Sequence, residues 1–184
     1  MSYLKNKFFT YLAVLIFTGL ALLATPNGSF AKEKDRSLSE QIRHELVTLP
    51  WYGVFDNLAY KIEGSTVTLY GQVVRPTTRT NAERRVARLA GVGQVVNNIE
   101  VLPLSGFDDE IRYRTVNAIS SYGSLYRYFL GANPSLHVIV DRGNITLEGV
   151  VANRTDANLA YIAARQVPGA FSVTNNLQIE NKRQ

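Results

Sequence analysis

The spacing of apolar side chains changes from helical to strand-like along the first half of the chain. Ile42, Leu46 and Leu49 share one face of a helix, and Ser39 is expected to cap its start. The apolar runs that follow predict two strands, a second helix and a closing strand, over residues 58–62, 67–73, 81–90 and 95–101. The predicted unit is α-β-β-α-β, a small three-stranded mixed sheet with two helices on one face.

The second half of the chain repeats this unit. The segment Val67-Thr-Leu-Tyr-Gly-Gln-Val73 recurs as Ile145-Thr-Leu-Glu-Gly-Val-Val151, at an offset of 78 residues that persists into the last strand. The second copy is predicted to begin with a helix that Asp108 or Asp109 caps and that buries Ile111. Its other elements are expected over residues 136–140, 145–151, 158–167 and 173–179. The chain is therefore predicted to be an α+β protein of two tandem units.

Glycine and asparagine recur at matching places in the two copies. Gly71 and Gly149 lie near the end of the second strand, where glycine allows a bulge or a close approach of two backbones. The pairs Asn97-Asn98 and Asn175-Asn176 lie in the closing strand, and their side chains are predicted to bond exposed strand or turn backbone. We assign these residues to the fold, because their repetition follows the fold and their chemistry is inert.

The first residues have the order of a secretory signal peptide. Two lysines precede an uncharged run over residues 8–24, and Pro26 and Gly28 break this run before a small-residue cleavage site at Ala31. Residues 1–31 are therefore predicted to be a cleaved signal peptide that exports the protein to the periplasm. An uncleaved anchor is the alternative, because the run is nearly long enough to span a bilayer when tilted. The predicted domains of the exported chain are residues 38–103 and 107–180.

The composition excludes several kinds of chemistry and partner. The chain has no cysteine, which excludes disulfides, thiolate catalysis and the lipid-attached cysteine of a lipoprotein. Removing residues 1–31 takes away two of the 20 lysines and arginines and none of the 15 acidic residues, which leaves a net charge of +3. This excess is small, so no nucleic acid partner is predicted.

No catalytic or metal site can be read from the sequence. His44 and His137 lack metal-ligand spacing, and His137 is predicted to point away from the helices toward the surface. The acidic run Asp108-Asp109-Glu110 is explained by its place at a helix start, where carboxylates complement the dipole and cap exposed amides. We therefore predict that the protein is not an enzyme and has no cofactor.

The second copy carries nine extra residues after its first helix. An aromatic segment, residues 122–131, lies at this insertion. Extending that helix predicts a packed stripe through Tyr126 and Phe129, and it leaves Tyr128 and Leu130 without an assigned place. The apolar surface of these rings is too large to remain exposed to water. It is expected to be buried by one of three things: the protein's own core or other repeat, a membrane interface, or a protein partner. Tyrosine beside arginine suits a headgroup boundary. The predicted membrane or partner contacts are Tyr126, Arg127, Tyr128, Phe129 and Leu130.

The two second helices differ on their outer faces. The first copy carries Arg84, Arg85 and Arg88 there, with further arginines at positions 75 and 79. A solvated surface explains such a cluster, and contact with an anionic membrane, worth about 1 kcal/mol per arginine, is the alternative. The second copy has an apolar face that is predicted to contact the other repeat or a second molecule, formed by Leu159, Tyr161 and Ile162.

The repeated motifs carry a family resemblance. The pattern V-T-L-x-G-x-V, then a helix, then V-x-N-N and an apolar residue resembles two copies of the BON domain, named for bacterial osmotically inducible protein Y and nodulation proteins. The resemblance implies a periplasmic or envelope protein without enzymatic activity, and some two-copy relatives associate with anionic phospholipid. Those relatives include outer-membrane lipoproteins, from which this chain departs because it lacks the lipid-attachment cysteine.

Two functions are consistent with these observations. The first is a non-enzymatic exported protein that binds anionic phospholipid headgroups peripherally and maintains the cell envelope, including under osmotic stress. The second is a periplasmic protein-interaction or chaperone-like module that binds polypeptides or another copy of itself. The aromatic segment and the arginines are expected to carry the first function, and the apolar helix face the second.

Overall fold

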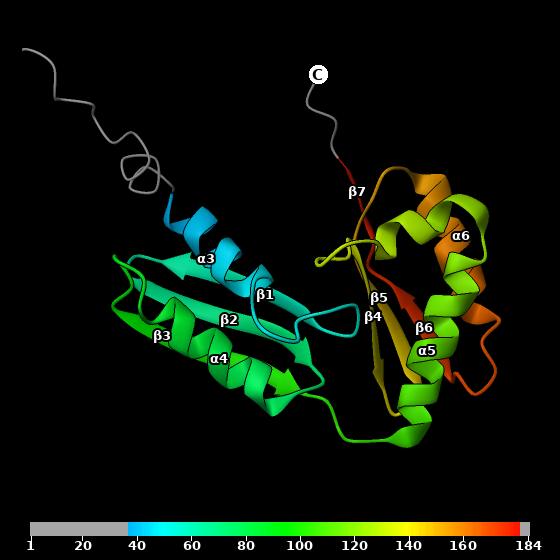
Figure 1. Ribbon diagram of the computed structural model, residues 1–184, viewed down its shortest axis with the longest axis horizontal. Coiled ribbons are helices and arrows are strands. Elements are labelled where there is room, and N and C mark those ends of the chain that lie inside the picture. Colours follow the sequence, from blue (N-terminus) through cyan, green and yellow to red (C-terminus); the bar gives the residue numbers. More distant parts are fainter. Residues whose placement is uncertain (1–36, 181–184) are drawn as a thin grey trace, which may run out of the picture. The chain divides into compact units, whose positions relative to one another are not determined.

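The elements of both repeats follow the predicted order (Figure 1). The computed structural model describes residues 37–180, so the predicted signal peptide lies outside the described residues. The first repeat consists of α3 (Leu38–Val47), β1 (Asn57–Glu63), β2 (Thr66–Val73), α4 (Pro76–Val86) and β3 (Gln94–Val101). The second consists of α5 (Gly106–Ser120), the 3-10 helix η1 (Gly123–Phe129), β4 (Leu136–Asp141), β5 (Asn144–Val151), α6 (Arg154–Arg165), β6 (Ser172–Asn175) and β7 (Gln178–Ile179).

Each repeat builds one mixed sheet. In the order β1-β2-β3, β1 is antiparallel to β2 and β2 is parallel to β3. The order β4-β5-β6 has the same directions, and β7 adds a short parallel pairing with β5. Parallel neighbours need a crossover, which α4 and α6 provide. The predicted α+β class and tandem units are confirmed, although the closing strand expected over residues 173–179 is divided into β6 and β7.

Both first helices begin at serines that the sequence reading did not select. Ser37, not Ser39, caps α3, because its Oγ accepts from the Glu40 amide at 3.2 Å and Glu40 Oε2 accepts from the Ser37 amide at 3.1 Å. Ser105 caps α5 by accepting from the Asp108 amide at 3.1 Å. The predicted caps at Ser39 and in the acidic run were wrong, since the capping residue is the one whose side chain reaches the third helical amide.

The second helices begin earlier than predicted. Helix α4 starts at Pro76 rather than Asn81, because proline is well suited to the first helical position. Helix α6 starts at Arg154 rather than Asn158, with Asn153 as its cap. Pro76 and Asn153 marked these helix starts in the sequence. The prediction missed them because the helical spacing of apolar residues becomes clear only about one turn later.

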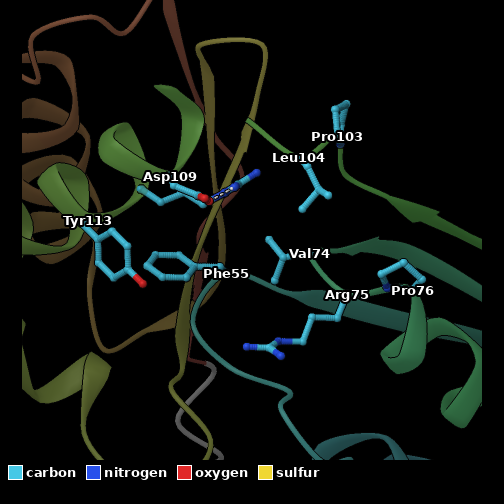
Figure 2. Close-up of a pocket in the computed structure, with 9 residues that line it drawn as sticks. Phe55, Val74, Arg75, Pro76, Pro103, Leu104, Asp109 and Tyr113 are labelled. Atoms are coloured by element: carbon cyan, nitrogen blue, oxygen red, sulfur yellow. Dashed lines mark hydrogen bonds and ion pairs between the residues drawn. The ribbon is translucent and has the colours of Figure 1, made fainter. Parts of the chain in front are cut away.

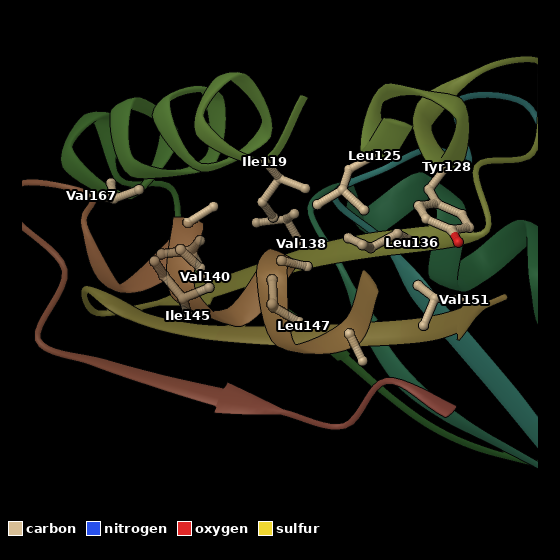
Figure 3. Packing of buried hydrophobic residues seen from close by; sticks show 14 of the residues in the cluster. Ile119, Leu125, Tyr128, Leu136, Val138, Val140, Ile145, Leu147, Val151 and Val167 are labelled. Carbon is tan, nitrogen blue, oxygen red and sulfur yellow. The ribbon is translucent and has the colours of Figure 1, made fainter. Parts of the chain in front are cut away.

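Each sheet packs a separate hydrophobic core against its helices, and Figure 3 shows the core of the second repeat. A fully buried leucine, isoleucine or valine stabilises the fold by about 1.5–3 kcal/mol. The first core includes Ile42, Leu46, Val67, Leu69, Ala82, Val86 and Ile99. The second includes Ile111, Ile119, Leu125, Tyr128, Leu136, Val138, Ile145 and Leu147.

The repeated glycines have the structural role that was predicted, and the asparagines have it in part, because Asn176 Nδ2 instead donates to the Glu148 side chain at 2.7 Å. Gly71 and Gly149 both have φ +112°, and a Cβ added there would lie 2.0 Å from Asn57 O or 2.1 Å from Ser135 O, so a close approach of backbones is confirmed. The equivalent asparagines of the two closing strands make the same bonds. Each donates from Nδ2 to a helix carbonyl at 3.2 Å, and its Oδ1 accepts from the backbone amide two residues later in the chain. These residues are Asn97 and Asn175.

The two repeats contact each other at the free edge of β4. The Val138 amide donates to Val54 O at 2.8 Å, and His137 Nδ1 lies 3.1 Å from Gly53 O. His137 is only 8% exposed, and its ring centroid is 5.6 Å from that of Tyr52. The predicted surface position of His137 was wrong, because a loop of the first repeat covers this face of β4. Burial lowers the pKa of His137 and raises the pKa of Tyr52 to about 12.

Candidate functional site

The aromatic segment does not continue helix α5. The helix ends at Ser120, Gly123 takes a φ of +40°, and the chain turns into the 3-10 helix η1. With three residues per turn, Leu125 and Tyr128 fall on one buried face. The predicted continuation of the helix was therefore wrong, since Tyr126 is exposed and Tyr128 is in the core. The predicted packing of Phe129 is confirmed. Leu130 is exposed, and Phe129 is half-buried against the core.

Tyr128 and Arg127 belong to a polar network inside the second repeat. The Tyr128 hydroxyl donates to Asp156 Oδ2 at 2.5 Å and accepts from the Ala152 amide at 2.9 Å. Arg127 Nη2 lies 2.6 Å from the same Asp156 oxygen, and its guanidinium sits 4.9 Å from the Tyr128 ring centroid. These bonds tie η1 to the start of α6, so a structural role accounts for both residues.

The arginines predicted on the first repeat are not equivalent. Arg84 and Arg88 are exposed, and Arg84 Nη1 donates to Asn81 at 3.2 Å. Arg85 is half-buried, and its Nη1 lies 3.3 Å from Glu45 Oε2. Two of the three cations are therefore available at the surface, while Glu45 neutralises the third.

The apolar face predicted on the second repeat is only partly exposed. Leu159 packs against the core, and the Tyr161 ring is half-buried with the Arg165 guanidinium 5.8 Å from its centroid. Ile162 is exposed on α6. A partner contact through this face stays a prediction that rests mainly on one isoleucine.

A different exposed cluster lies where α5 begins and the β4–β5 hairpin turns. Phe107 is 50% exposed and Phe171 is 75% exposed, and their ring centroids are 6.2 Å apart. The neighbouring turn residues Arg142 and Gly143 have φ values of +48° and +76°, as a tight hairpin of this hand requires. The Arg142 side chain is exposed. We call Phe107, Phe171 and Arg142 the aromatic tip.

The buried carboxylate of Asp108 fixes the aromatic tip. Its Oδ1 accepts from the Gly143 amide at 2.8 Å and its Oδ2 from the Arg142 amide at 3.0 Å, which ties the hairpin to the start of α5. The Phe171 amide donates to Gly143 O at 2.8 Å, and a Cβ on Gly143 would come within 2.7 Å of the Phe171 ring. The acidic run was predicted to cap a helix, but Asp108 instead holds a turn that presents two rings to solvent.

The electrostatics of the tip allow it to meet an anion. Arg142 Nη2 lies 2.8 Å from Asp141 Oδ2, and this hydrogen bond, together with the charges of Asp141, Glu100 and Asp108, raises the pKa of Arg142, which stays charged. Exposed ion pairs are weak, so a phosphate can compete for the guanidinium. The tip thus combines two solvent-facing rings with one cation, which suits a boundary between headgroups and acyl chains.

The sequence contained a signal for this tip that motif reading missed. At the offset of 78 residues Phe171 corresponds to Gly93, and at the shift between the first helices Phe107 corresponds to Leu38. The first repeat folds with smaller residues at these two sites. The phenylalanines of the second repeat therefore indicate a role other than folding. Their closeness could not be predicted, because it depends on how the hairpin meets the helix start.

The described part of the chain offers little for other chemistry. Between residues 37 and 180, no helix has the length and apolar character needed to cross a bilayer. Over the same residues, no three acidic or histidine side chains gather in a way that could hold a metal ion.

Comparison with solved structures gives weak similarity. A structure of the C-terminal domain of CdsD, a structural protein of the type III secretion system of Chlamydia trachomatis, shares 12% identity and a TM-score of 0.32, over 79% of this chain and 98% of that one. A second CdsD structure from the same organism shares 12% identity and a TM-score of 0.28, over 79% and 93%. Scores this low support no argument about fold or function. No curated protein matches the chain.

A family model gives a clear result. The BON domain model matches residues 34–103 and 127–181, which together make up more than half of the chain. The two matches fall on the two repeats of the structure, and the second begins within η1. BON domain proteins are typically periplasmic or envelope-associated and generally lack enzymatic activity. The chain belongs to the BON domain family.

Proposed function

We propose that this protein is a non-enzymatic envelope protein that binds phospholipid membranes peripherally through the aromatic tip of its second repeat, with a preference for anionic lipid. The observation that supports this proposal is the pair of exposed rings, Phe107 and Phe171, held beside Arg142 by the buried carboxylate of Asp108. Rigid rings lose little conformational entropy when they enter an interface.

The magnitude fits reversible binding. The exposed fractions of Phe107 and Phe171, 50% and 75%, leave about one and a quarter phenylalanine side chains to bury. At roughly 1.5–3 kcal/mol per fully buried side chain, this contact is worth about 2–4 kcal/mol. Such an energy gives weak attachment, to which the positive charge of the exported chain adds attraction for anionic lipid that falls with salt.

Maintenance of the envelope, including under osmotic stress, is the physiological role that we propose for this contact. Family membership supports the envelope setting. The sequence has no cysteine to carry a lipid anchor, and in this proposal the aromatic tip of the second repeat supplies a reversible attachment. A protein that associates weakly and reversibly can redistribute as the lipid surface changes.

The tip and the aromatic segment make separable predictions. Tyr126 and Leu130 are exposed on or beside η1, next to the start of β4, whereas the tip lies at the other end of the β4–β5 hairpin (Figure 1). The second repeat therefore has a candidate membrane contact at each of its two ends. The tip is favoured because its two exposed rings adjoin each other. Both arginines are ion-paired, Arg142 with Asp141 and Arg127 with Asp156, but the Arg142 side chain is the more exposed of the two.

The test is co-sedimentation with vesicles of phosphatidylcholine, with or without phosphatidylglycerol, at low and high salt. The protein is produced from the full chain, and its intact mass shows whether residues 1–31 have been removed. We expect binding to phosphatidylglycerol vesicles that salt weakens and that the Phe107→Ser/Phe171→Ser variant loses by about tenfold or more. The matched control, Tyr126→Ser/Leu130→Ser, should bind as the parent does.

The outcome that contradicts the tip is equally clear. If the η1 variant loses binding while the tip variant keeps it, and both have the parent's circular dichroism spectrum, the membrane contact lies at η1. Absence of binding by the processed parent protein to either vesicle would remove phospholipid as a partner of the isolated protein.

A further inference from the structure

A cleft of about 370 Å³ lies where the end of β2, the linker after β3 and helix α5 meet (Figure 2). Its volume is within the range of sites that hold small ligands. Residues of both repeats and of the linker form its wall, including Phe55, Val74, Arg75, Leu104, Arg112 and Tyr113. We call it the linker cleft.

One part of the linker cleft is apolar and open to solvent. The rings of Phe55 and Tyr113 meet edge to face with centroids 5.2 Å apart, and Figure 2 shows them side by side. Leu104 of the linker is 97% exposed, although it lines the same cleft. A leucine in this state gains from any apolar group that covers it, so this part of the cleft suits an alkyl or aryl group.

The other part of the cleft is cationic. Arg112 is 3% exposed; its Nη1 bonds Asp109 at 2.5 Å and its Nη2 bonds Val140 O at 2.6 Å, but its buried Nε has no hydrogen-bond partner among residues 37–180. Arg75 is exposed at the rim, and no carboxylate in the described part of the chain forms an ion pair with it. Both arginines also act electrostatically on the buried carboxylate of Asp56. Arg75 nevertheless has no direct ion pair and Arg112 keeps a spare donor, which favours an anionic ligand.

Trp51 sits against this cationic rim. Its ring lies under the Arg75 guanidinium, 4.8 Å from centroid to Cζ, and it is 71% exposed. Its φ is +69°, a left-handed conformation that is costly for a bulky residue and that clusters at binding sites. The stacked pair holds Arg75 in place, and the ring reports any change at the rim.

We propose that the linker cleft binds a single-chain anionic amphiphile, with a carboxylate or phosphate head at Arg75 and Arg112 and an alkyl chain along Phe55, Tyr113 and Leu104. The charge of the two arginines and the exposed apolar wall carry this inference, which does not depend on membrane binding by the aromatic tip. Asp109 also lines the cleft and is ion-paired with Arg112, so the head competes with this carboxylate for Arg112 but not for Arg75.

The experiment is a titration of the full-chain product with decanoate or decyl phosphate below their micellar concentrations, by calorimetry and by fluorescence of Trp51, the only tryptophan of the chain. We expect saturable binding of at least one amphiphile. Decanol, which lacks the charge, and inorganic phosphate, which lacks the chain, should each bind at least about tenfold more weakly. The stronger of the two amphiphiles identifies the head as carboxylate or phosphate.

Variants separate this site from the rest of the surface. Arg75→Gln should weaken amphiphile binding by about tenfold. Arg79→Gln, which changes an exposed arginine of the helix that Arg75 precedes, should leave it unchanged. Tyr113→Ala tests the apolar wall, and Phe107→Ser/Phe171→Ser should bind the amphiphile as the parent does. Absence of saturable heat with both amphiphiles overturns the proposal, as does equal binding of decanol or equal binding by a folded Arg75→Gln protein.

Discussion

The equivalent ends of the two repeats have the same backbone and different side chains. In the first repeat the Gly93 amide donates to Ser65 O at 2.8 Å, and in the second the Phe171 amide donates to Gly143 O at the same distance. Gly91 packs beside Leu38, 3.8 Å from a built Cβ, where Gly169 packs beside Phe107 at 3.3 Å. The end that carries two exposed rings in one repeat carries a glycine and a half-buried leucine in the other.

This difference separates what the fold requires from what it merely permits. The main-chain bond and the positive-φ glycines occur in both repeats, so the fold needs them. The rings and the buried carboxylate occur in one repeat only, because Ser39 occupies the corresponding helix position in the first and bonds Tyr60 instead. Side chains that the first repeat folds without are the ones to test for function.

The largest effect is expected where the repeats agree. Gly71→Ala and Gly149→Ala each place a Cβ about 2 Å from a backbone oxygen at φ +112°, so both should destabilise the protein by about 4 kcal/mol. Urea unfolding followed by circular dichroism measures this change. Gly106→Ala, with open space at its Cβ and no positive φ, is the control and should stay within about 0.5 kcal/mol of the parent. A mild effect at only one of the two glycines would show that the repeats do not share this backbone constraint.

The next effect should differ between the repeats. Asp108→Ala leaves the Arg142 and Gly143 amides without their buried acceptor, so it should cost about 2–3 kcal/mol. Ser39→Ala removes only an exposed side-chain bond to Tyr60 and should cost about 0.5 kcal/mol or less. Equal losses in urea unfolding would mean that Asp108 does not hold the hairpin as the distances indicate.

Local pattern was enough to predict the shared elements, and it failed where segments distant in sequence meet. The helices, strands and asparagine roles follow from periodicity and repetition, which act over a few residues. The burial of His137 depends on a loop some 84 residues away, and the exposure of Tyr126 depends on a break at Gly123. The aromatic tip brings together residues from the start of α5, the β4–β5 turn and the segment before β6. Each could be compared with its counterpart in the first repeat, but the sequence did not show that the three lie together.

A pH effect should distinguish the outer faces of β1 and β4. His137 is buried there in the second repeat, while the corresponding Ala59 is exposed in the first. Burial lowers the folded-state pKa of His137 below its ordinary value near 6.5, so the unfolded chain takes up a proton first as the pH falls. This contribution to stability is therefore present above pH 6.5 and is lost as the pH falls below it.

Comparison with His137→Gln isolates this contribution. Burial raises the pKa of the neighbouring Asp56, whose protonation acts in the opposite direction, because its stabilising effect is present at low pH and is lost as the pH rises through its folded pKa. Urea unfolding of both proteins from pH 7.5 to pH 5 should show a smaller loss of stability in the variant, and the difference is the part that His137 carries. Parallel curves would show that His137 is free to protonate in the folded protein.

The smallest effect should come from making the second helices alike. Ile162 corresponds to Arg84 at the offset of 78 residues, and both are exposed, so Ile162→Arg should change the unfolding free energy by no more than about 0.5 kcal/mol. The same variant tests the alternative function by light scattering over a range of concentrations. If the parent protein self-associates and Ile162→Arg does not, although its stability is unchanged, then the α6 face is a contact surface. If the mass of both proteins is that of one chain at every concentration, the divergence between α4 and α6 has no role in self-association. The phenylalanines of the tip would then be the main remaining difference between the repeats that a function has to explain.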